Sequence, residues 1–274
     1  MPELPEVETT KRGLSYILDK QIKQIFRSNK KMRFDSTLPL DLLEGNAVKS
    51  LDRRARYLLI KLQNNKTLIV HLGMSGRMTL LKDNELDNYE IQKHDHLILD
   101  FGSDLVIFND PRRFGFIDLI NDEDFTAHKL IANLGPEPLS EEFNEKYLFE
   151  KLQKKSSNIK NVMMDNTIVV GVGNIYINES LFRSNIMPTR AANSLKKSEI
   201  KKLVNNIKEI LTLAIEYKGS SINDYVHSDG KLGNFQRNFY VYGLENSECK
   251  VCKNPIKRIV QNGRSTFYCD KCQK

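Results

Sequence analysis

Four cysteines near the C-terminus have the spacing of a metal site. They form the pattern Cys249-x2-Cys252-x16-Cys269-x2-Cys272, and the sequence contains no other cysteine. Four thiolates fill the tetrahedral shell of Zn²⁺ and leave no position for a substrate. We therefore predict one structural zinc ion (Zn2+). Two disulfides or four free thiols are the alternative, which conflicts with the reducing compartment that the rest of the sequence indicates.

The N-terminal residues could supply a nucleophile. Met1 precedes Pro2, a small residue after which the initiator methionine is usually removed. The secondary amine that remains would have a pKa of about 8. Part of it is therefore unprotonated at neutral pH and can attack a carbon atom. Glu3 and Glu6 flank this amine as candidate proton carriers. The alternative is that Met-Pro-Glu only begins a helix.

Three further segments have residues suited to nucleic acid. The turn-like DPRRFG at 110–115 carries Arg112 and Phe114. Arginine reaches phosphates and unpaired bases, and an apolar side chain such as Phe114 or Met74 can enter between base steps. The alternative is that both apolar residues lie at the edge of a core. Asn174 follows GVG, which is typical of a phosphate-binding helix start, although the third glycine of a dinucleotide site is missing.

The composition narrows the class of partner. Lysine and arginine outnumber aspartate and glutamate by 42 to 35, which gives a net charge of +7. This excess favours a polyanion such as nucleic acid, although many lysine-rich proteins bind none. The acidic start MPELPEVE lacks the order of a secretory signal, and no apolar run approaches the roughly 18 residues of a membrane span. We expect a cytoplasmic protein.

Hydrophobic periodicity separates a β-rich first half from a helical second half. The apolar positions of an expected opening helix are Val7, Leu14, Ile17 and Leu18. Short apolar segments separated by turn-like NN, GS and DPRRFG stretches predict strands at 57–62, 67–72, 96–101 and 105–110. Two prolines and a glycine at 133–139 indicate a domain boundary. Beyond it, a 3.6-residue period predicts a long helix at 195–217.

Taken together and in this order, the motifs resemble those of the formamidopyrimidine-DNA glycosylases, bacterial enzymes that excise oxidised purines from DNA. The matching segments are PELPEVE at 2–8, RRARYLL at 53–59, HLGMSG at 71–76, KHDH at 93–96, DPRRFG at 110–115, LGPEPL at 134–139, VVGVGNIY at 169–176 and NGRSTFYC at 262–269. The resemblance covers essentially the whole chain and implies an α+β fold. The implied parts are a catalytic β-sandwich domain at 1–133, a linker at 134–145, a helical helix–two-turn–helix domain at 146–234 and a zinc finger at 235–274.

The resemblance also implies a chemistry. Pro2 would attack C1′ of the damaged nucleoside and form a Schiff base, while Glu3 would handle the proton that opens the sugar ring. Two successive eliminations would then cut the strand on both sides of the lesion, with Arg264 assisting the second. The expected enzyme is a DNA glycosylase, a hydrolase, that is also an abasic-site lyase.

In the resembled family the damaged base leaves the stack, and three side chains fill the gap. Met74, Arg112 and Phe114 match those positions. The remaining expected DNA contacts are Glu6, His94, Lys155, Asn174 and Arg264. The segment 219–234, which includes Ser220, Ser221 and Tyr225, resembles the loop that closes over the extruded base.

One catalytic position departs from the family pattern. Arg56 stands in RRARYLL where the family normally has a lysine that acts near the damaged base and in elimination. Arginine keeps the charge, but a pKa above about 12 makes proton transfer much harder. We predict weaker excision of 8-oxoguanine than in relatives, with removal of formamidopyrimidines retained.

Three alternatives stay open. The sister class that removes oxidised pyrimidines has the same fold and the same proline, and Leu4 and the long 219–234 segment favour the purine enzyme. A lesion-binding protein without chemistry would keep the DNA contacts and lose activity through Arg56. A generic zinc-finger protein would leave Pro2 and Glu3 unexplained. The expected partner is damaged double-stranded DNA, bound by a monomer that needs no protein partner.

Overall fold

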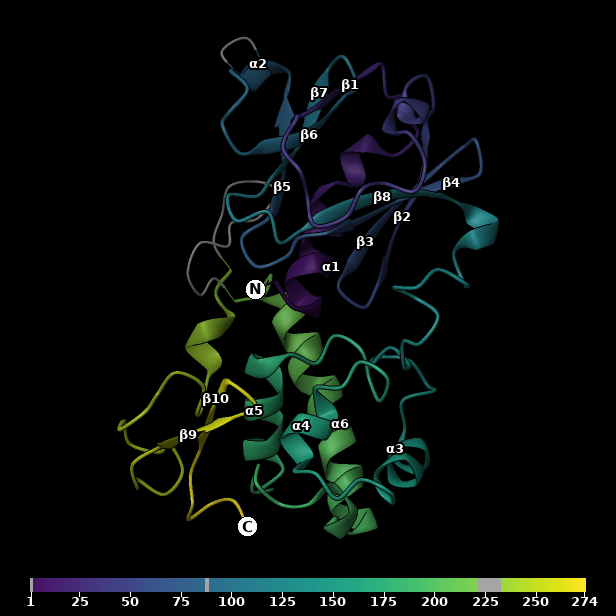
Figure 1. Cartoon of the computed structure of the whole chain (residues 1–274). Helices are drawn as coiled ribbons and strands as arrows, with labels where there is room; N and C mark the ends of the chain where they lie inside the picture. The colour runs from purple at the N-terminus through teal and green to yellow at the C-terminus, as the bar shows by residue number, and fades with distance from the viewer. Residues whose placement is uncertain (1, 87–88, 221–232) are drawn as a thin grey trace. The chain divides into compact units, whose positions relative to one another are not determined.

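The computed structural model describes residues 2–86, 89–220 and 233–274 (Figure 1). The chain forms two compact units. The first is Met1–Ala132 with Tyr217–Asn234, and the second is Asn133–Glu216 with Phe235–Lys274. None of the helices in the described ranges is both long and apolar enough to cross a membrane.

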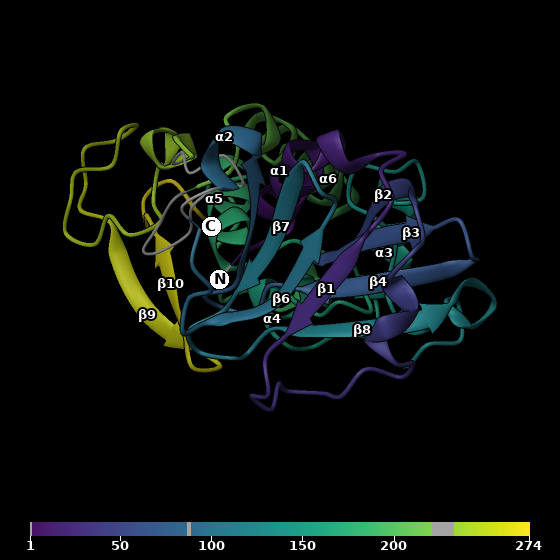
Figure 2. The same ribbon diagram turned by 90° about the horizontal axis from the view of Figure 1, so that it is seen from above.

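The first unit contains two four-stranded antiparallel sheets, whose strands are visible in Figure 2. One sheet has the order β1 (Gln24–Arg27), β6 (Asp95–Asp100), β7 (Asp104–Asn109) and β5 (Arg77–Lys82). The other has the order β2 (Val48–Arg54), β3 (Tyr57–Leu62), β4 (Lys66–His71) and β8 (Phe116–Asn121). Every pairing is between antiparallel neighbours. The four strands expected from the sequence therefore exist, each within one residue of its expected bounds.

One hydrophobic core joins the inner faces of the two sheets. Leu58 and Ile60 of β3 belong to the same buried cluster as Leu97 and Leu99 of β6. Leu59, between the first pair, faces away into a separate cluster, as the two-residue period of a strand requires. This arrangement confirms the expected β-sandwich within an α+β fold.

The opening helix is shorter than the apolar pattern predicted. α1 spans Leu4–Gly13, and the chain then tightens into a 3-10 turn at Ser15–Ile17. Val7, Leu14 and Ile17 are buried in the sandwich core, but Leu18 is 40% exposed. The prediction that Leu18 shares one helical face with the other three was wrong, because the α-helix ends at Gly13 and its 3.6-residue period no longer applies.

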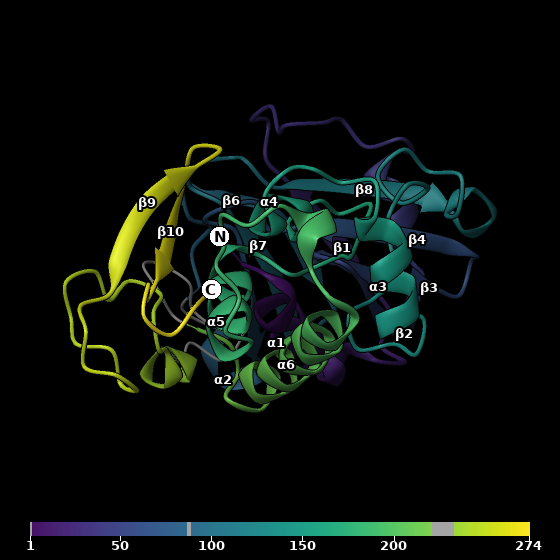
Figure 3. The ribbon, with the colours of Figure 1, turned by 90° about the horizontal axis from the view of Figure 1, so that it is seen from below.

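The second unit is built mainly from helices, which Figure 3 shows from below. Its elements are α3 (Glu145–Leu152), α4 (Ile159–Met163), α5 (Asn174–Arg183), α6 (Lys197–Glu216), and the hairpin of β9 (Lys257–Gln261) and β10 (Arg264–Tyr268). α6 packs against both α3 and α5. The expected helix at 195–217 is confirmed, and all nine of its apolar positions named by the period are buried: Leu195, Ile200, Leu203, Val204, Ile207, Ile210, Leu211, Ala214 and Ile215.

The structure groups part of the expected helical domain with the sandwich. Tyr217–Asn234 belongs to the first unit, whereas the sequence assigned 146–234 to one helical domain. This grouping has a physical reason, because Ser220 donates two hydrogen bonds to Glu6 of α1. The short α2 (Asp83–Leu86) also lies in the first unit.

Candidate functional site

The N-terminal dipeptide is held by the start of α1. Glu3 is the N-cap residue, and a capping box joins it to Glu6: the side chain of each accepts a hydrogen bond from the backbone N–H of the other. The bond from Glu3 N to Glu6 Oε2 is 2.9 Å long. Pro2 and Glu3 are both buried, and Pro5 lies in the first turn. The interpretation of Met-Pro-Glu as a helix start is thus confirmed, and the same geometry fixes the place of the amine.

Glu6 also binds the chain that follows α6. Its Oε1 accepts the Ser220 backbone N–H at 2.7 Å and the Ser220 hydroxyl at 3.1 Å. Gly219 has a φ of +76°, and a Cβ there would lie 2.8 Å from the same oxygen. Only a glycine lets the backbone approach so closely in this conformation. Because Glu6 is 2% exposed and bonded to protein donors on both oxygens, its geometry suits positioning.

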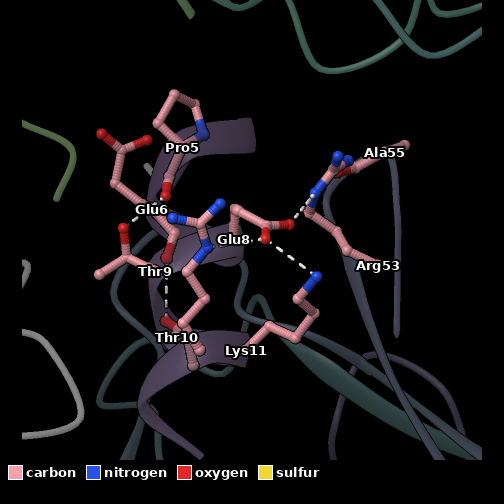
Figure 4. Close-up of polar contacts among 9 residues, drawn as sticks. Pro5, Glu6, Glu8, Thr9, Thr10, Lys11, Arg53 and Ala55 are labelled. Atoms are coloured by element: carbon pink, nitrogen blue, oxygen red, sulfur yellow. Dashed lines mark hydrogen bonds and ion pairs between the residues drawn. The ribbon is translucent and has the colours of Figure 1, made fainter. Parts of the chain in front are cut away.

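A second carboxylate links α1 to the turn between β2 and β3, as Figure 4 shows. Glu8 is 7% exposed and accepts Arg53 Nε at 3.0 Å and Lys11 Nζ at 2.9 Å. Arg53 in turn donates from Nη1 to the carbonyl oxygen of Ala55 at 3.0 Å. Burial raises the pKa of the Glu8 carboxyl, but the hydrogen bonds and charges of Lys11 and Arg53 outweigh it and hold that pKa below its usual value. Sequence reasoning missed this pair.

Arg56 occupies the turn that Glu8 and Arg53 support. It follows Ala55, whose φ of +54° makes the sharp reversal into β3. Its positive charge acts on His71, which pairs with Tyr57 across β3 and β4. Burial, followed by the charges of Arg56 and Arg33, lowers the pKa of His71 to about 4. The ring is therefore neutral at physiological pH, and its Nδ1 accepts the Gly73 N–H at 3.1 Å.

The expected gap-filling side chains come together on two adjoining loops. Met74 and Phe114 are each 45% exposed, and the Arg112 guanidinium lies 4.8 Å from the Phe114 ring centre. The loops touch through their backbones, because a Cβ on Gly73 would lie 2.3 Å from Gly115 N. Such exposure of two large apolar residues disfavours the core-edge alternative.

The second unit brings Asn174 and Arg264 close together. Asn174 begins α5, as the GVGN pattern predicted, and its Nδ2 donates to the Ser265 carbonyl oxygen at 3.1 Å. Lys160 is fully buried and donates from Nζ to the same carbonyl oxygen at 3.0 Å. Burial, then the charge of Arg264, lowers the pKa of Lys160 to about 8. Lys155 lies between α3 and α4, with its backbone bonded to Leu152 and Asn193.

Lys160 was not found from the sequence, and neither was Glu179. The Glu179 carboxylate is buried on α5 and accepts three backbone N–H groups, those of Tyr240, Val241 and Tyr242, at 2.8 to 3.0 Å. Burial raises the pKa of Glu179 against the effect of these donors. A charged residue inside an otherwise apolar helical stripe was the signal that could have identified it.

The expected site residues are divided between the two units. Those in the first unit are Pro2, Glu3, Glu6, Arg56, Met74, His94, Arg112 and Phe114. Those in the second unit are Lys155, Asn174, Arg264 and the four cysteines. Of the expected loop, Ser220 pairs with Asn234 in an isolated bridge, and Ser221 and Tyr225 lie outside the described residues.

The four cysteine sulfurs form a cluster of the size that zinc requires. All four Sγ atoms lie within 4.8 Å of one another, with Cys249 to Cys272 at 3.9 Å and Cys252 to Cys269 at 3.4 Å. Zinc–sulfur bonds of about 2.3 Å in a tetrahedron place sulfurs about 3.8 Å apart. None of the four is in a disulfide. The donors therefore fit one structural zinc ion, as the spacing predicted.

Family models match most of the chain in three consecutive segments. Residues 1–117 match the formamidopyrimidine-DNA glycosylase N-terminal domain. Residues 134–226 match the formamidopyrimidine-DNA glycosylase H2TH domain. Residues 246–274 match a zinc finger found in FPG and IleRS.

Individual relatives match the chain over its full length. A formamidopyrimidine-DNA glycosylase of Hydrogenovibrio crunogenus is 46% identical, with 100% of this chain and 97% of the relative aligned. The crystal structure of the MutM (FPG) protein of Thermus thermophilus has a TM-score of 0.88 and 36% identity over 99% of this chain and 98% of its own. A Lactococcus lactis FPG variant in complex with DNA containing Fapy-dG has a TM-score of 0.91 and 35% identity, with both chains fully covered.

Proposed function

The chain belongs to the formamidopyrimidine-DNA glycosylase family, and from that premise we propose that it excises oxidised purines, formamidopyrimidines and 8-oxoguanine, from double-stranded DNA and then cleaves the abasic strand. The observation that carries the proposal is the capping box at the start of α1. It fixes Pro2 and Glu3 side by side at a helix N-terminus. The positive end of the helix dipole disfavours an ammonium ion there, which favours the nucleophilic amine.

In the proposed reaction the Pro2 nitrogen attacks C1′ of the damaged nucleoside. The bond from C1′ to the base breaks, and the base leaves with the proton that the Pro2 amine gives up. Glu3 then supplies the proton that opens the sugar ring, which leaves a positively charged iminium (the Schiff base) between Pro2 and C1′. The imine withdraws electrons and acidifies the C2′ proton, so the phosphate on the 3′ side is eliminated. A second elimination, which we assign to assistance by Arg264, releases the phosphate on the 5′ side.

We assign the remaining site residues to DNA. Met74, Arg112 and Phe114 fill the gap that the extruded nucleotide leaves, in keeping with their exposure on adjoining loops. The residues assigned to DNA contact are Glu6, His94, Lys155, Asn174 and Arg264. For Glu6 we add a positioning role, because its oxygens hold Glu3 and Ser220.

The zinc finger is the structural part of the DNA-binding machinery. Its zinc ion is held by the four thiolates of Cys249, Cys252, Cys269 and Cys272, so the metal has no free position for a reactant. When bound, it orders the segment that carries Arg264. We propose that the protein acts on DNA as a monomer in the cytoplasm.

Borohydride trapping tests the proposed function. The protein is mixed with a duplex that contains one abasic site, and sodium borohydride reduces any imine to a stable protein–DNA adduct. We expect an adduct with the natural protein and none with Pro2→Gly carrying an acetylated N-terminus. A lesion panel then separates oxidised purines from oxidised pyrimidines. A protein that binds the lesion duplex but gives no adduct would be a binding protein and would refute the proposal.

A further inference from the structure

Asp110 lies where the loops of the proposed gap-filling residues meet. We propose that Asp110 is the positioning residue that holds Met74, Arg112 and Phe114 in one arrangement before DNA binds. This inference rests on the proposed function, because it takes those three side chains to enter the duplex. It adds a role for a residue that touches neither the lesion nor the nucleophile in that scheme.

The Asp110 carboxylate bonds to both loops. It is 0% exposed. Its Oδ1 accepts the Ser75 hydroxyl at 2.6 Å, from the residue next to Met74, and the Arg112 N–H at 3.3 Å. Its Oδ2 accepts the Gly115 N–H at 2.8 Å, from the residue next to Phe114. One buried side chain therefore fixes the backbone beside Met74 and beside Phe114, on the two segments that we call the probe loops.

The Asp110 backbone binds a third segment. Its N–H donates to the His94 carbonyl oxygen at 3.0 Å. Its carbonyl oxygen lies 3.0 Å from Nε2 of the buried His96, which must donate because the acceptor carries no proton. The other ring nitrogen, Nδ1, lies 2.9 Å from the Ser28 hydroxyl oxygen. Asp110 thus connects the KHDH segment, which carries the expected DNA contact His94, to the two loops that carry Met74 and Phe114.

A carboxylate suits this place because the groups that bond to it, the Ser75 hydroxyl and the Arg112 and Gly115 N–H groups, all act as donors. Aspartate accepts hydrogen bonds on both oxygens, whereas asparagine would turn an NH₂ group towards either the Gly115 N–H or the Arg112 N–H, neither of which can accept it. Burying such a mismatch leaves a donor unsatisfied. Met74 and Phe114 project from the surface, so loss of this anchor would let their loops sample many conformations. The ordering that Asp110 provides in advance would then have to occur during DNA binding.

The matched control is Asp118, another buried carboxylate of the same unit. It is 3% exposed on β8, and it accepts the Thr37 N–H at 2.6 Å and His128 Nε2 at 3.1 Å. Asp118→Asn disturbs a comparable polar network away from the probe loops. A general loss of fold would affect both variants, whereas a positioning role affects Asp110→Asn alone.

The experiment compares the natural protein, Asp110→Asn and Asp118→Asn in three assays. The first is single-turnover excision of Fapy-dG paired with cytosine in a duplex. The second is the fluorescence rise of a 2-aminopurine placed beside the lesion, which reports unstacking by an inserted side chain. The third is borohydride trapping on a single-stranded abasic oligonucleotide at saturating protein, where there is no stacked duplex to enter.

We expect Asp110→Asn to excise about 30-fold more slowly, as for one lost buried hydrogen bond to a charged group. Its 2-aminopurine response should fall as well, while its single-strand trapping stays within about threefold of the natural protein. Ser75→Ala should show the same pattern at about threefold, which keeps the test available if Asp110→Asn does not fold. Equal excision by the two aspartate variants, or an unchanged 2-aminopurine response in Asp110→Asn, would overturn the proposal. If the natural protein gives no adduct, the proposed function fails, and the fluorescence response still decides the role of Asp110.

Discussion

The pair of Glu8 and Arg53 joins the helix that begins at the nucleophile to the turn that carries Arg56. Replacing Glu8 with glutamine keeps the shape of the side chain and removes its charge. The Arg53 side chain is 11% exposed and would stay buried without its carboxylate. We expect the turn at Ala55 to loosen, because Arg53 also holds the Ala55 carbonyl oxygen.

The size of the effect follows from burial. Removing one partner of a fully buried ion pair costs about 3–5 kcal/mol, and Glu8 is 10% exposed at its side chain, so we expect the lower end, about 3 kcal/mol. Arg12 also contacts Glu8, at 3.1 Å, but its side chain is 62% exposed. Surface pairs of that kind contribute about 0.5 kcal/mol or less. Arg12→Gln is therefore the matched control.

Urea denaturation of the natural protein and the variants at pH 7 measures these values. A double-mutant cycle with Glu8→Gln and Arg53→Met isolates the pair, and we expect a coupling of about 2 kcal/mol. Since the folded-state pKa of Glu8 lies below its ordinary value of 4.5, its stabilisation is present above pH 4.5 and is lost as the pH falls through the folded pKa. Additive substitutions, or an Arg12→Gln effect equal to that of Glu8→Gln, would refute the reasoning.

Three other outcomes follow from the structure. Arg56→Lys should speed single-turnover excision of 8-oxoguanine relative to formamidopyrimidine, and equal ratios in both proteins would contradict the proton-transfer argument. The pKa of His71 is about 4 in the folded protein and 6.5 in the unfolded chain, so the free energy of unfolding should fall by up to about 3 kcal/mol as the pH falls from 6.5 to 4. Acid denaturation of His71→Gln should lack this loss. Zinc chelation should lower DNA affinity at least about tenfold, and added zinc should restore it in the natural protein but not in Cys249→Ser, as fluorescence anisotropy would show.

The parts of the fold that the sequence revealed are those with a strong local apolar pattern. Strand β3 is an apolar run in which Leu58, Leu59 and Ile60 are all buried, and α6 keeps its apolar stripe through five turns, so both could be located closely. Strand β1 was not located because it has only four residues and none of them is fully buried, which leaves no long apolar run to detect. Leu18 was misplaced because a helical period carries no information about where the helix ends.

The residues of the candidate site also fall into those that the sequence identified and those that it did not. The cysteines were recognisable because the spacing of two close pairs is itself the signal of a metal site, and the N-terminal dipeptide because Glu6, its partner in the capping box, lies three positions after Glu3. The supports of the site were not, because each depends on contacts between distant segments: Glu8 with Arg53, Lys160 with Ser265, and Asp110 with Ser75. A buried charge in the sequence shows only that a partner is needed, and the fold decides which one.

The capping box at the start of α1 stabilises the helix without using the nitrogen that would react with DNA. It uses the backbone N–H and side chain of Glu3 and the same groups of Glu6, and it makes no use of the Pro2 nitrogen. A peptide fused ahead of Pro2, such as an affinity tag, or a retained Met1 would turn the amine into an amide without disturbing the helix. Such a fusion should fold, hold damaged DNA and never turn it over. The same chain could thereby serve as a probe that marks lesions in place.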